Sequence, residues 1–266
     1  MLVLANGAFK SGSTWLREIV RHLLPFDPIP KQFQHPDLPH WIDERKLRSF
    51  LAAGDHRTHS YLSKSHLYDP GLRDLLLSDD SVRVFNIKRD TRDVLVSHYF
   101  HVRRMKTISG SFSDYYWKLG RFKAWQIWRY HDVWNVPSPR LHSTSFERLK
   151  HSFSEEVHKI GDFLGVTLSP EDIGRIHLET SLQRLQENRG EAGKPQADRF
   201  FRKGEIGDWK NHFDQTILDD LAALGSKGLG FGEALKYKMI YDYRLRLKAL
   251  LRLRNSVTSR VWRHFI

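Results

Sequence analysis

Apolar residues along the chain follow two kinds of pattern, one typical of strands and one typical of helices. Short runs rich in Val, Leu, Ile and Phe predict strands over residues 2–9, 61–64, 82–88 and 140–146. Other apolar residues recur every three or four positions and predict helices over residues 15–24, 91–104 and around 125–134. Strands alternating with helices indicate an α/β fold, in which a P-loop-like, mostly parallel central sheet is flanked by helices on both faces.

The stretch between the first two strands differs from the rest. Residues 25–59 contain five prolines, Pro25, Pro28, Pro30, Pro36 and Pro39. Because proline lacks a backbone N–H and interrupts regular structure, we expect mostly loop here, with one short helix over residues 43–53.

Basic residues follow directly on three of the predicted strands. Lys10 follows the first strand, Lys64 and His66 the second, and Arg89 the third. Ligands of open α/β sheets bind beyond the carboxyl ends of the strands. We therefore expect these side chains to converge on one crevice that suits a polyanion.

The composition excludes some kinds of chemistry and indicates where the protein works. The 266 residues are 40% apolar, which is ample for a packed core, and the absence of cysteine excludes disulfides, thiolate metal ligands and cysteine nucleophiles. No run of about 18 apolar residues is present, and the first residues do not resemble a signal peptide. We expect a cytoplasmic protein.

The net charge of +12 is unevenly distributed. Residues 234–266 hold nine Lys or Arg and one acidic residue, Asp242, so their net charge is +8, whereas the preceding 233 residues carry +4. A nucleic-acid binder would be more uniformly basic, and no nucleic acid is expected as a partner.

The tail itself has an amphipathic pattern. Apolar residues of the segment 236–266 recur at roughly helical spacing beside a stripe of Arg244, Lys248 and Arg252, which predicts a basic C-terminal helix. Such a helix either lies on an anionic membrane surface, docks an acidic partner, or packs on its own domain. The first possibility would make the protein peripheral at a membrane.

Three motifs carry the candidate chemistry. The loop Lys10-Ser11-Gly12-Ser13-Thr14-Trp15 would offer backbone N–H groups to an anion at a helix start, although a Walker A loop would place its lysine after the second glycine. Arg89 ends a strand, and Ser97 lies two turns into the next helix. The segment 201–213, beginning Phe201-Arg202-Lys203-Gly204, adds two glycines that let amides approach an oxyanion.

In order and spacing, these motifs resemble those of the PAPS-dependent, cytosolic-type sulfotransferases over roughly residues 1–232. PAPS is 3′-phosphorylated adenosine phosphosulfate, and PAP is the product left after sulfuryl transfer. The resemblance implies a sulfotransferase domain over residues 1–235 and an extension over 236–266. It also implies transfer of the sulfuryl group of PAPS to a hydroxyl of a small molecule, lipid or carbohydrate.

The resemblance assigns roles as well. The segment Leu62-Ser63-Lys64-Ser65-His66 is similar to the family's Leu-Lys-Thr-His, so His66 is expected to be the general base. Lys10 is expected to stabilise the departing phosphate, and Lys64 to face the sulfuryl oxygens. The residues expected to bind the nucleotide are Lys10, Ser11, Gly12, Ser13, Thr14, Trp15, Arg89, Ser97, Phe146, Thr180, Phe201, Arg202, Lys203 and Gly204.

The chain departs from the family pattern at two nucleotide positions. Phe146 stands where the family often has Tyr, so it can stack but cannot donate a phenolic hydrogen bond, and Leu182 stands where the family often has Phe. No metal is expected, because the His56/His59 and His98/His101 pairs lack a third ligand.

The acceptor is not identified by any motif. Its walls are expected around residues 31–58, 103–116 and 186–200, where Tyr115 and Tyr116 would offer an aromatic face. Two other interpretations stay open, namely a P-loop kinase-like phosphotransferase and a non-catalytic basic adaptor at a membrane surface.

Overall fold

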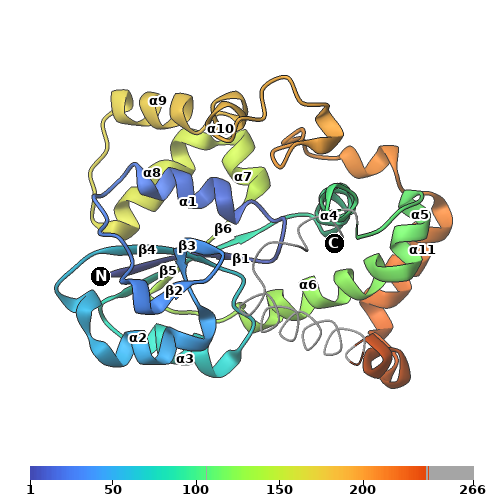
Figure 1. Ribbon diagram of the computed structural model, residues 1–266, viewed down its shortest axis with the longest axis horizontal. Helices are drawn as coiled ribbons and strands as arrows, with labels where there is room; N and C mark the ends of the chain where they lie inside the picture. The colour runs from blue at the N-terminus through green and yellow to red at the C-terminus, as the bar shows by residue number, and fades with distance from the viewer. Residues whose placement is uncertain (106, 238, 240–266) are drawn as a thin grey trace, which may run out of the picture.

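A parallel four-stranded sheet forms the centre of the computed structural model, which describes residues 1–105, 107–237 and 239 (Figure 1). The sheet has the order β4-β1-β5-β6, and all three neighbouring pairs are parallel. Its strands are β1 (Leu2–Gly7), β4 (Tyr61–Ser65), β5 (Val82–Lys88) and β6 (Leu141–Ser145). The four predicted strands are confirmed, with small differences at their ends.

Side chains of β1 alternate between the two faces of the sheet, as the period of a strand requires. Leu2 and Leu4 belong to one buried cluster, and Val3 and Ala5 belong to the other. Because β1 is buried on both sides, helices must cover both faces.

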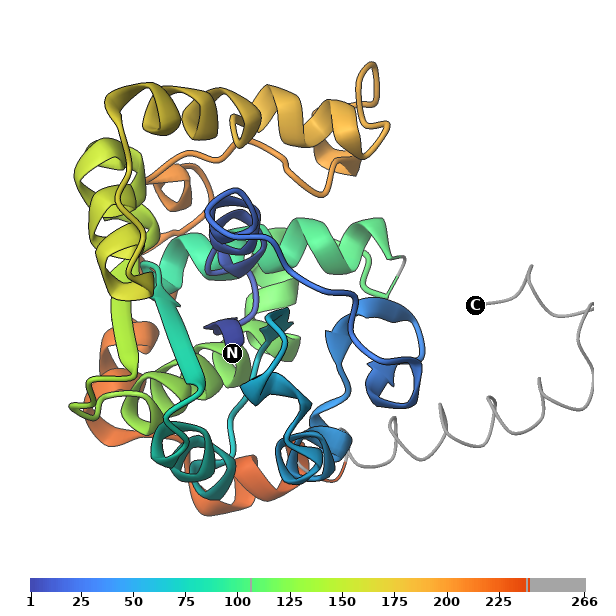
Figure 2. The same ribbon diagram turned by 90° about the vertical axis from the view of Figure 1, so that its left-hand side faces the viewer.

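Helices from both halves of the chain cover these faces (Figures 1 and 2). The upper face in Figure 1 carries α1 (Ser13–Arg21), α7 (Phe146–His151), α8 (Phe153–Leu164) and α9 (Pro170–Glu179), with α10 (Leu182–Asn188) following. The opposite cluster includes residues of α2 (Leu47–Ala53), α3 (Pro70–Ser78), α4 (Thr91–Arg104), α5 (Phe112–Tyr115), α6 (Arg121–Val133) and α11 (Gln215–Lys227). A π-helical turn, η4 (Tyr116–Gly120), joins α5 to α6.

Single turns of 3-10 helix complete the description. They are η1 (Lys31–Phe33), η2 (Glu44–Lys46), η3 (Asp55–Arg57), η5 (Gln196–Asp198) and η6 (Asp208–Asn211). The helix predicted over residues 91–104 is present with those bounds, and the Asp90 side chain caps it by accepting from the Arg92 N–H at 2.8 Å.

The proline-rich stretch holds more regular structure than predicted. Strands β2 (Gln34–His35) and β3 (Leu38–Ile42) form an antiparallel pair, so the expectation of loop was wrong for these residues. The Ile42 N–H donates to Ser63 Oγ at 2.9 Å, which ties this pair to β4. η2 and α2 together cover the predicted short helix over 43–53.

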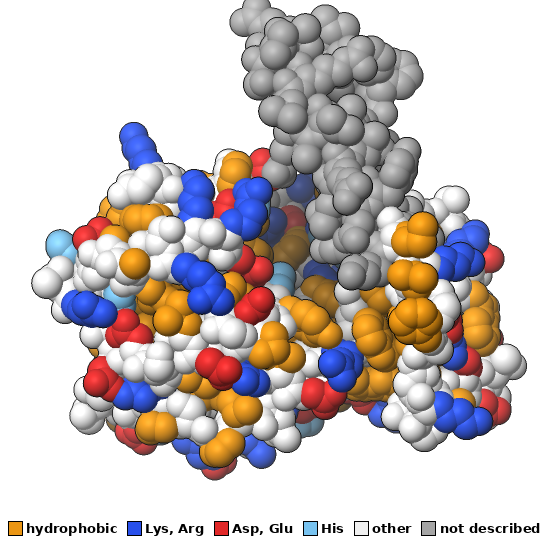
Figure 3. Space-filling view, turned by 90° about the horizontal axis from the view of Figure 1, so that it is seen from below, with side chains coloured by type: hydrophobic (Ala, Val, Ile, Leu, Met, Phe, Trp, Pro, Cys, Tyr) orange, Lys and Arg blue, Asp and Glu red, His pale blue; other side chains and the backbone are white. Residues whose placement is uncertain are grey.

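The predicted basic C-terminal helix, residues 236–266, lies outside the described residues apart from 236, 237 and 239. No helix among the described residues is both long and apolar enough to cross a membrane. On the face drawn in Figure 3, Lys and Arg side chains are interspersed with Asp and Glu.

Candidate active site

The carboxyl ends of β1, β4 and β5 open onto a cleft of about 970 Å³. Lys10, Lys64, His66 and Arg89, which follow or end these three strands, all line this cleft. The predicted crevice is therefore present, and the parallel register of the sheet brings its basic residues together.

The loop after β1 has an unusual backbone. Lys10 has a φ of +63°, and Gly12, which precedes the first turn of α1, has a φ of +105°. A Cβ atom at Gly12 would lie 3.0 Å from Phe146 Cδ2, so any larger residue would require that ring to move, and the φ itself favours glycine. A left-handed conformation is uncommon for a lysine, and such conformations cluster at functional sites.

Lys10 is buried in a cationic surrounding. Its Nζ lies 4.3 Å from the centre of the Phe200 ring. Burial, followed by the nearby charges of Arg104, Arg89, Arg189 and Arg202, lowers the pKa of Lys10 to about 7. An anion bound beside this ammonium would favour its charged form.

His66 is held in one tautomer by the end of β1. Its Nδ1 lies 2.6 Å from the carbonyl oxygen of Gly7. A carbonyl can only accept, so Nδ1 carries the proton and Nε2 of the neutral ring is a free base. Burial, and then the charge of Lys64, lowers the pKa of His66 to about 3, so the imidazole stays neutral at physiological pH.

Lys64 completes the reacting end of the cleft. Its Nζ lies 3.3 Å from His66 Nε2 and 4.2 Å from the centre of the Trp41 ring. Burial and the nearby Lys10 lower its pKa to about 7. Trp41 also packs edge-on against His66, with ring centres 5.6 Å apart. A hydroxyl placed beside His66 Nε2 would thus have the Trp41 ring and the amino groups of Lys64 and Lys10 near it.

A second anion-binding end is built around Arg89. Its guanidinium stacks on Phe146 at 4.1 Å and donates from Nη2 to the Glu205 carbonyl oxygen at 2.8 Å. Its Nε is buried without a partner among the described residues. Trp15 packs edge-on against Phe146, with ring centres 5.4 Å apart. This end can hold an aromatic ring and a phosphate next to each other.

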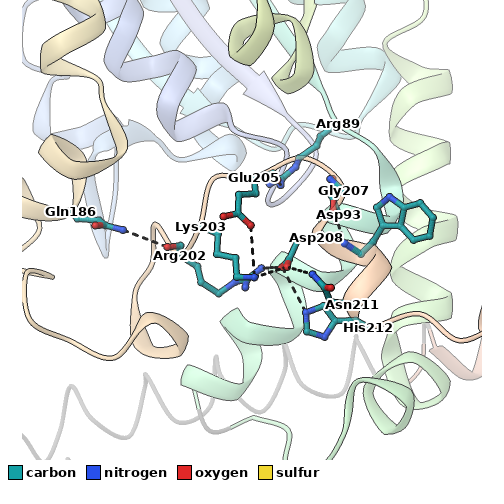
Figure 4. A network of polar contacts seen from close by, with 11 residues as sticks. Arg89, Asp93, Gln186, Arg202, Lys203, Glu205, Gly207, Asp208, Asn211 and His212 are labelled. Atoms are coloured by element: carbon teal, nitrogen blue, oxygen red, sulfur yellow. Dashed lines mark hydrogen bonds and ion pairs between the residues drawn. The ribbon is translucent and has the colours of Figure 1, made fainter.

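The segment after residue 200 is folded around Asp208 (Figure 4). Both Arg202 and Lys203 pair with the Asp208 carboxylate, and Lys203 Nζ lies 2.7 Å from Oδ1. Burial opposes ionisation of Asp208, but the hydrogen bonds from Lys203 and Arg202 outweigh it and keep the pKa well below its usual value. The carboxylate thus fixes two cations at the wall of the cleft.

Fourteen of the sequence-predicted site residues line the cleft. They are Lys10, Gly12, Ser13, Thr14, Trp15, Lys64, His66, Arg89, Ser97, Phe146, Phe201, Arg202, Lys203 and Gly204.

Two predicted nucleotide-binding residues, Ser11 and Thr180, do not line the cleft. The Ser11 side chain donates to the Ala8 carbonyl oxygen at 2.6 Å, and its backbone N–H faces the same oxygen. Thr180 is buried and donates to the Ile176 carbonyl oxygen at 2.7 Å. Both hydroxyls bond the local backbone, and their expected part in nucleotide binding stays a prediction.

The expected acceptor walls are partly corrected. Tyr115 and Tyr116 are fully buried and bond to His98 and Asp220 respectively, so they offer no face to an acceptor. Other residues of the three expected ranges do line the cleft, among them Trp41, Met105 and Phe200. No group of three or more potential metal ligands is found among the described residues.

Two carboxylates that support the site were missed from sequence. Asp93 of α4 accepts hydrogen bonds from the backbone N–H groups of Gly207 and Trp209. Glu191 accepts from the N–H groups of Phe200 and Phe201 at 2.9 and 3.3 Å. Asp93 bonds amides more than 100 residues away, and Glu191 bonds amides of a loop. No sequence pattern predicts either kind of hydrogen bond.

Comparisons with known proteins agree with the fold and the motifs. Sulfotransferase 1C2 of Rattus norvegicus is 27% identical over 258 residues, covering 86% of this chain and 83% of the relative. Sulfotransferase 1E1 of Bos taurus is 26% identical over 227 residues, covering 78% and 76%. The model of the sulfotransferase domain matches residues 3–227, and the chain therefore belongs to the sulfotransferase domain family.

Solved structures share the same architecture. Mouse sulfotransferase SULT7A1 complexed with PAP has a TM-score of 0.61 at 19% identity, covering 90% of this chain and 88% of that one. Retinol dehydratase in complex with androsterone and inactive cofactor PAP has a TM-score of 0.62 at 21% identity, covering 86% and 81%. The predicted fold class is thereby confirmed.

Proposed function

We propose that the protein transfers the sulfuryl group of PAPS to a hydroxyl of an acceptor and releases PAP, with His66 as the general base. Family membership supports the reaction class. The related structures of retinol dehydratase and SULT7A1 both contain PAP, and residues of all three motifs that resemble those of the family line one cleft.

The observation that carries this proposal is the fixed tautomer of His66. With Nδ1–H bonded to the Gly7 oxygen at 2.6 Å, Nε2 takes the proton of the acceptor hydroxyl as its oxygen attacks sulfur. The bond between sulfur and the bridging oxygen breaks, and the negative charge develops on the phosphate of PAP. Lys10 stabilises that charge, and Lys64 faces the oxygens of the transferred group.

PAPS carries two anionic groups that the protein must bind, the 5′-phosphosulfate and the 3′-phosphate. Lys10 and the loop through Thr14 suit the phosphosulfate, whereas Arg89, Ser97, Arg202 and Gly204 suit the 3′-phosphate. Trp15 and Phe146 line the same cleft and offer ring faces or edges to adenine. In this proposal, side chains and backbone N–H groups bind the nucleotide, and no metal is required.

The experiment is transfer of radiolabelled sulfate from PAPS into fractionated cell extract, with His66→Ala as the matched variant. We expect label in an acceptor fraction with the parent protein and its loss in the variant. A thermal shift with PAP larger than with ADP separates sulfuryl transfer from a kinase-like phosphotransferase. If PAP raises the melting temperature no more than ADP, the proposal is wrong.

The same proposal assigns the catalytic domain to residues 1–235 and an extension to residues 236–266. Support for the extension is compositional only, since residues 234–266 carry nine Lys or Arg and one acidic residue. In this proposal a cytoplasmic protein docks through the extension on an anionic membrane or an acidic partner. Sedimentation of intact and truncated protein with vesicles containing anionic lipid tests the membrane form.

A further inference from the structure

The acceptor side of the cleft differs in chemistry from the nucleotide side. We propose that the natural acceptor carries an anionic group in addition to its hydroxyl, and that Arg189 and Arg17 bind this group. The chemical class is a hydroxyl compound bearing a carboxylate, phosphate or sulfate. This inference rests on the proposed function and narrows its substrate class.

Arg189 stands next to the reacting groups. It follows the last turn of α10 and stacks on the Phe200 ring at 4.4 Å, while Lys10 Nζ lies 4.3 Å from the centre of the same ring. Arg189 and Lys64 both line the cleft. A ligand whose hydroxyl meets His66 therefore has a guanidinium within the same cleft.

Positive charge exceeds negative charge on this side. The lining side chains away from the phosphate motifs include Arg17, Arg21, Lys64 and Arg189, against Glu18 and Asp37. Glu18 is shared, because Arg17 and Arg21 bond to its two oxygens at 2.7 and 2.8 Å. One carboxylate thus balances only one of these two arginines.

A further carboxylate, that of Glu191, lies near Arg189 and is also shared between several partners. Glu191 lies 3.7 Å from Arg189 Nε, but its oxygens also accept the backbone N–H groups of Phe200 and Phe201. Arg104 packs on the Phe200 ring at 5.4 Å and adds a further cation. Arg104 also faces the exposed Asp198, whose effect water screens. The surplus of positive charge beside Phe200 remains.

The protonation of the neighbouring groups reflects this surplus. Burial and then nearby cations lower the pKa values of both Lys10 and Lys64 to about 7, with Arg189 among the causes for each. For His40, burial and then Arg17 lower the pKa. An anion at this position would relieve repulsion that the empty cleft retains.

Two residues that line this side have buried hydrogen-bond donors. Arg17 Nε and Trp41 Nε1 are buried without partners among the described residues. His101 Nδ1 must accept from Arg104 Nη2 at 3.0 Å, because arginine can only donate. The His101 pKa of about 4 keeps the ring neutral, so its proton lies on Nε2 as a further donor. Acceptor-rich oxyanions match this set, whereas a neutral apolar compound leaves the donors unmatched.

The test compares matched acids and esters on the PAP-loaded full chain. The probes are 4-hydroxybenzoate, 4-hydroxyphenylacetate and methyl glucuronide, each against its methyl ester, with affinity measured by saturation-transfer NMR. We expect at least one acid to bind roughly tenfold more tightly than its ester, as an added charge pair in a desolvated site gives. Transfer from PAPS should show the same preference in kcat/KM.

Arg189→Gln should bring the ratio of acid to ester affinity to about one, while a thermal shift with PAP shows that the variant is folded. Arg184→Gln is the matched control, since Arg184 lies on α10, is half-exposed and pairs with Glu179 and Glu187. It should keep the preference for the acid.

Equal affinities of acid and ester in every pair, including no binding of either, overturn the inference. A preference that survives in Arg189→Gln overturns the role of Arg189. Failure of the proposed function is seen separately, as absence of PAP binding or of sulfate transfer to any acceptor.

Discussion

The carboxylate of Asp93 accepts the backbone N–H of Gly207 at 2.7 Å, across 114 residues of sequence. A second bond of 3.0 Å runs from the Trp209 N–H to the other oxygen of the same carboxylate. Asp93 is buried in α4, four residues before Ser97. The helix that carries Ser97 therefore also holds the segment that carries Arg202 and Lys203.

We expect Asp93→Asn to lower the free energy of unfolding by about 1–3 kcal/mol, because one of the two buried N–H groups then faces an amide NH₂. PAP affinity should fall as well, since the Arg202 segment loses its support. Urea unfolding and calorimetric PAP titration measure the two effects. Asp219→Asn is the control, as Asp219 is exposed and bonds only Gln215 in the described structure. Unchanged PAP affinity in Asp93→Asn would contradict this coupling.

His66→Ala should lower kcat by about 10²–10⁴-fold, the usual contribution of a general base, with little change in PAP affinity. The low pKa of His66, about 3, means that the base is already deprotonated throughout the range from pH 5 to pH 8. The acid limb of the rate profile should accordingly lie below pH 5. His158→Ala, an exposed histidine on α8, is the control. An acid limb centred near pH 6.5 would show that a different histidine limits the rate.

The pKa of Lys10, about 7 in the empty cleft, predicts how nucleotide binding depends on pH. Below pH 7 the lysine is charged both free and bound, so affinity is constant. Above pH 7 the free protein loses this charge and must take up a proton to bind the phosphosulfate. PAPS affinity should then fall, by up to about tenfold per pH unit, until the raised pKa of the complex is reached.

Calorimetry in buffers of different ionisation enthalpy measures the proton taken up by Lys10. Lys10→Arg keeps its charge at all these pH values, so the fall in affinity should be reduced. Lys64 has a similar pKa, and the variant Lys64→Arg shows how much of the proton uptake is due to Lys64. Affinity that is flat from pH 6 to pH 9.5 would show that neither lysine titrates on binding.

The strands and the main helices were predictable because their side-chain periods are local properties. In β5, Val82 and Val84 belong to one buried cluster and Phe85 and Ile87 to the other, and this pattern is legible in the sequence. The hairpin of β2 and β3 could not be predicted from the sequence, because Pro36 and Pro39 weaken any strand pattern. So short a pair is stabilised by tertiary contacts such as Ile42 to Ser63 rather than by propensity.

The basic residues of the site were found because each follows a strand, and parallel strands end at one edge. The supporting carboxylates Asp93 and Glu191 were not found, since each bonds backbone amides and leaves no spacing to detect. The side-chain orientations of Ser11 and Thr180 could not be predicted either. Their positions fit the family motif, but hydrogen bonds to Ala8 and Ile176 decide where their hydroxyls point.

Gly12→Ala should damage the nucleotide site through contact as well as through backbone strain. The φ of +105° is costly for any residue with a Cβ atom, by about 1–2 kcal/mol. The added atom would also lie 3.0 Å from Phe146 and 3.3 Å from Ile87. Phe146 supports the Arg89 guanidinium at 4.1 Å, so moving the ring would displace the group that we propose binds the 3′-phosphate.

Gly165→Ala separates the two causes, because Gly165 has a φ of +71° and nothing within 4 Å of an added Cβ. It ends α8 and is absent from the cleft lining. We expect both variants to lose stability in urea unfolding, but only Gly12→Ala to lose PAP affinity. Since the strain at Gly165 cannot reach Arg89, equal PAP affinities in the two variants would mean that Phe146 yields without moving the arginine.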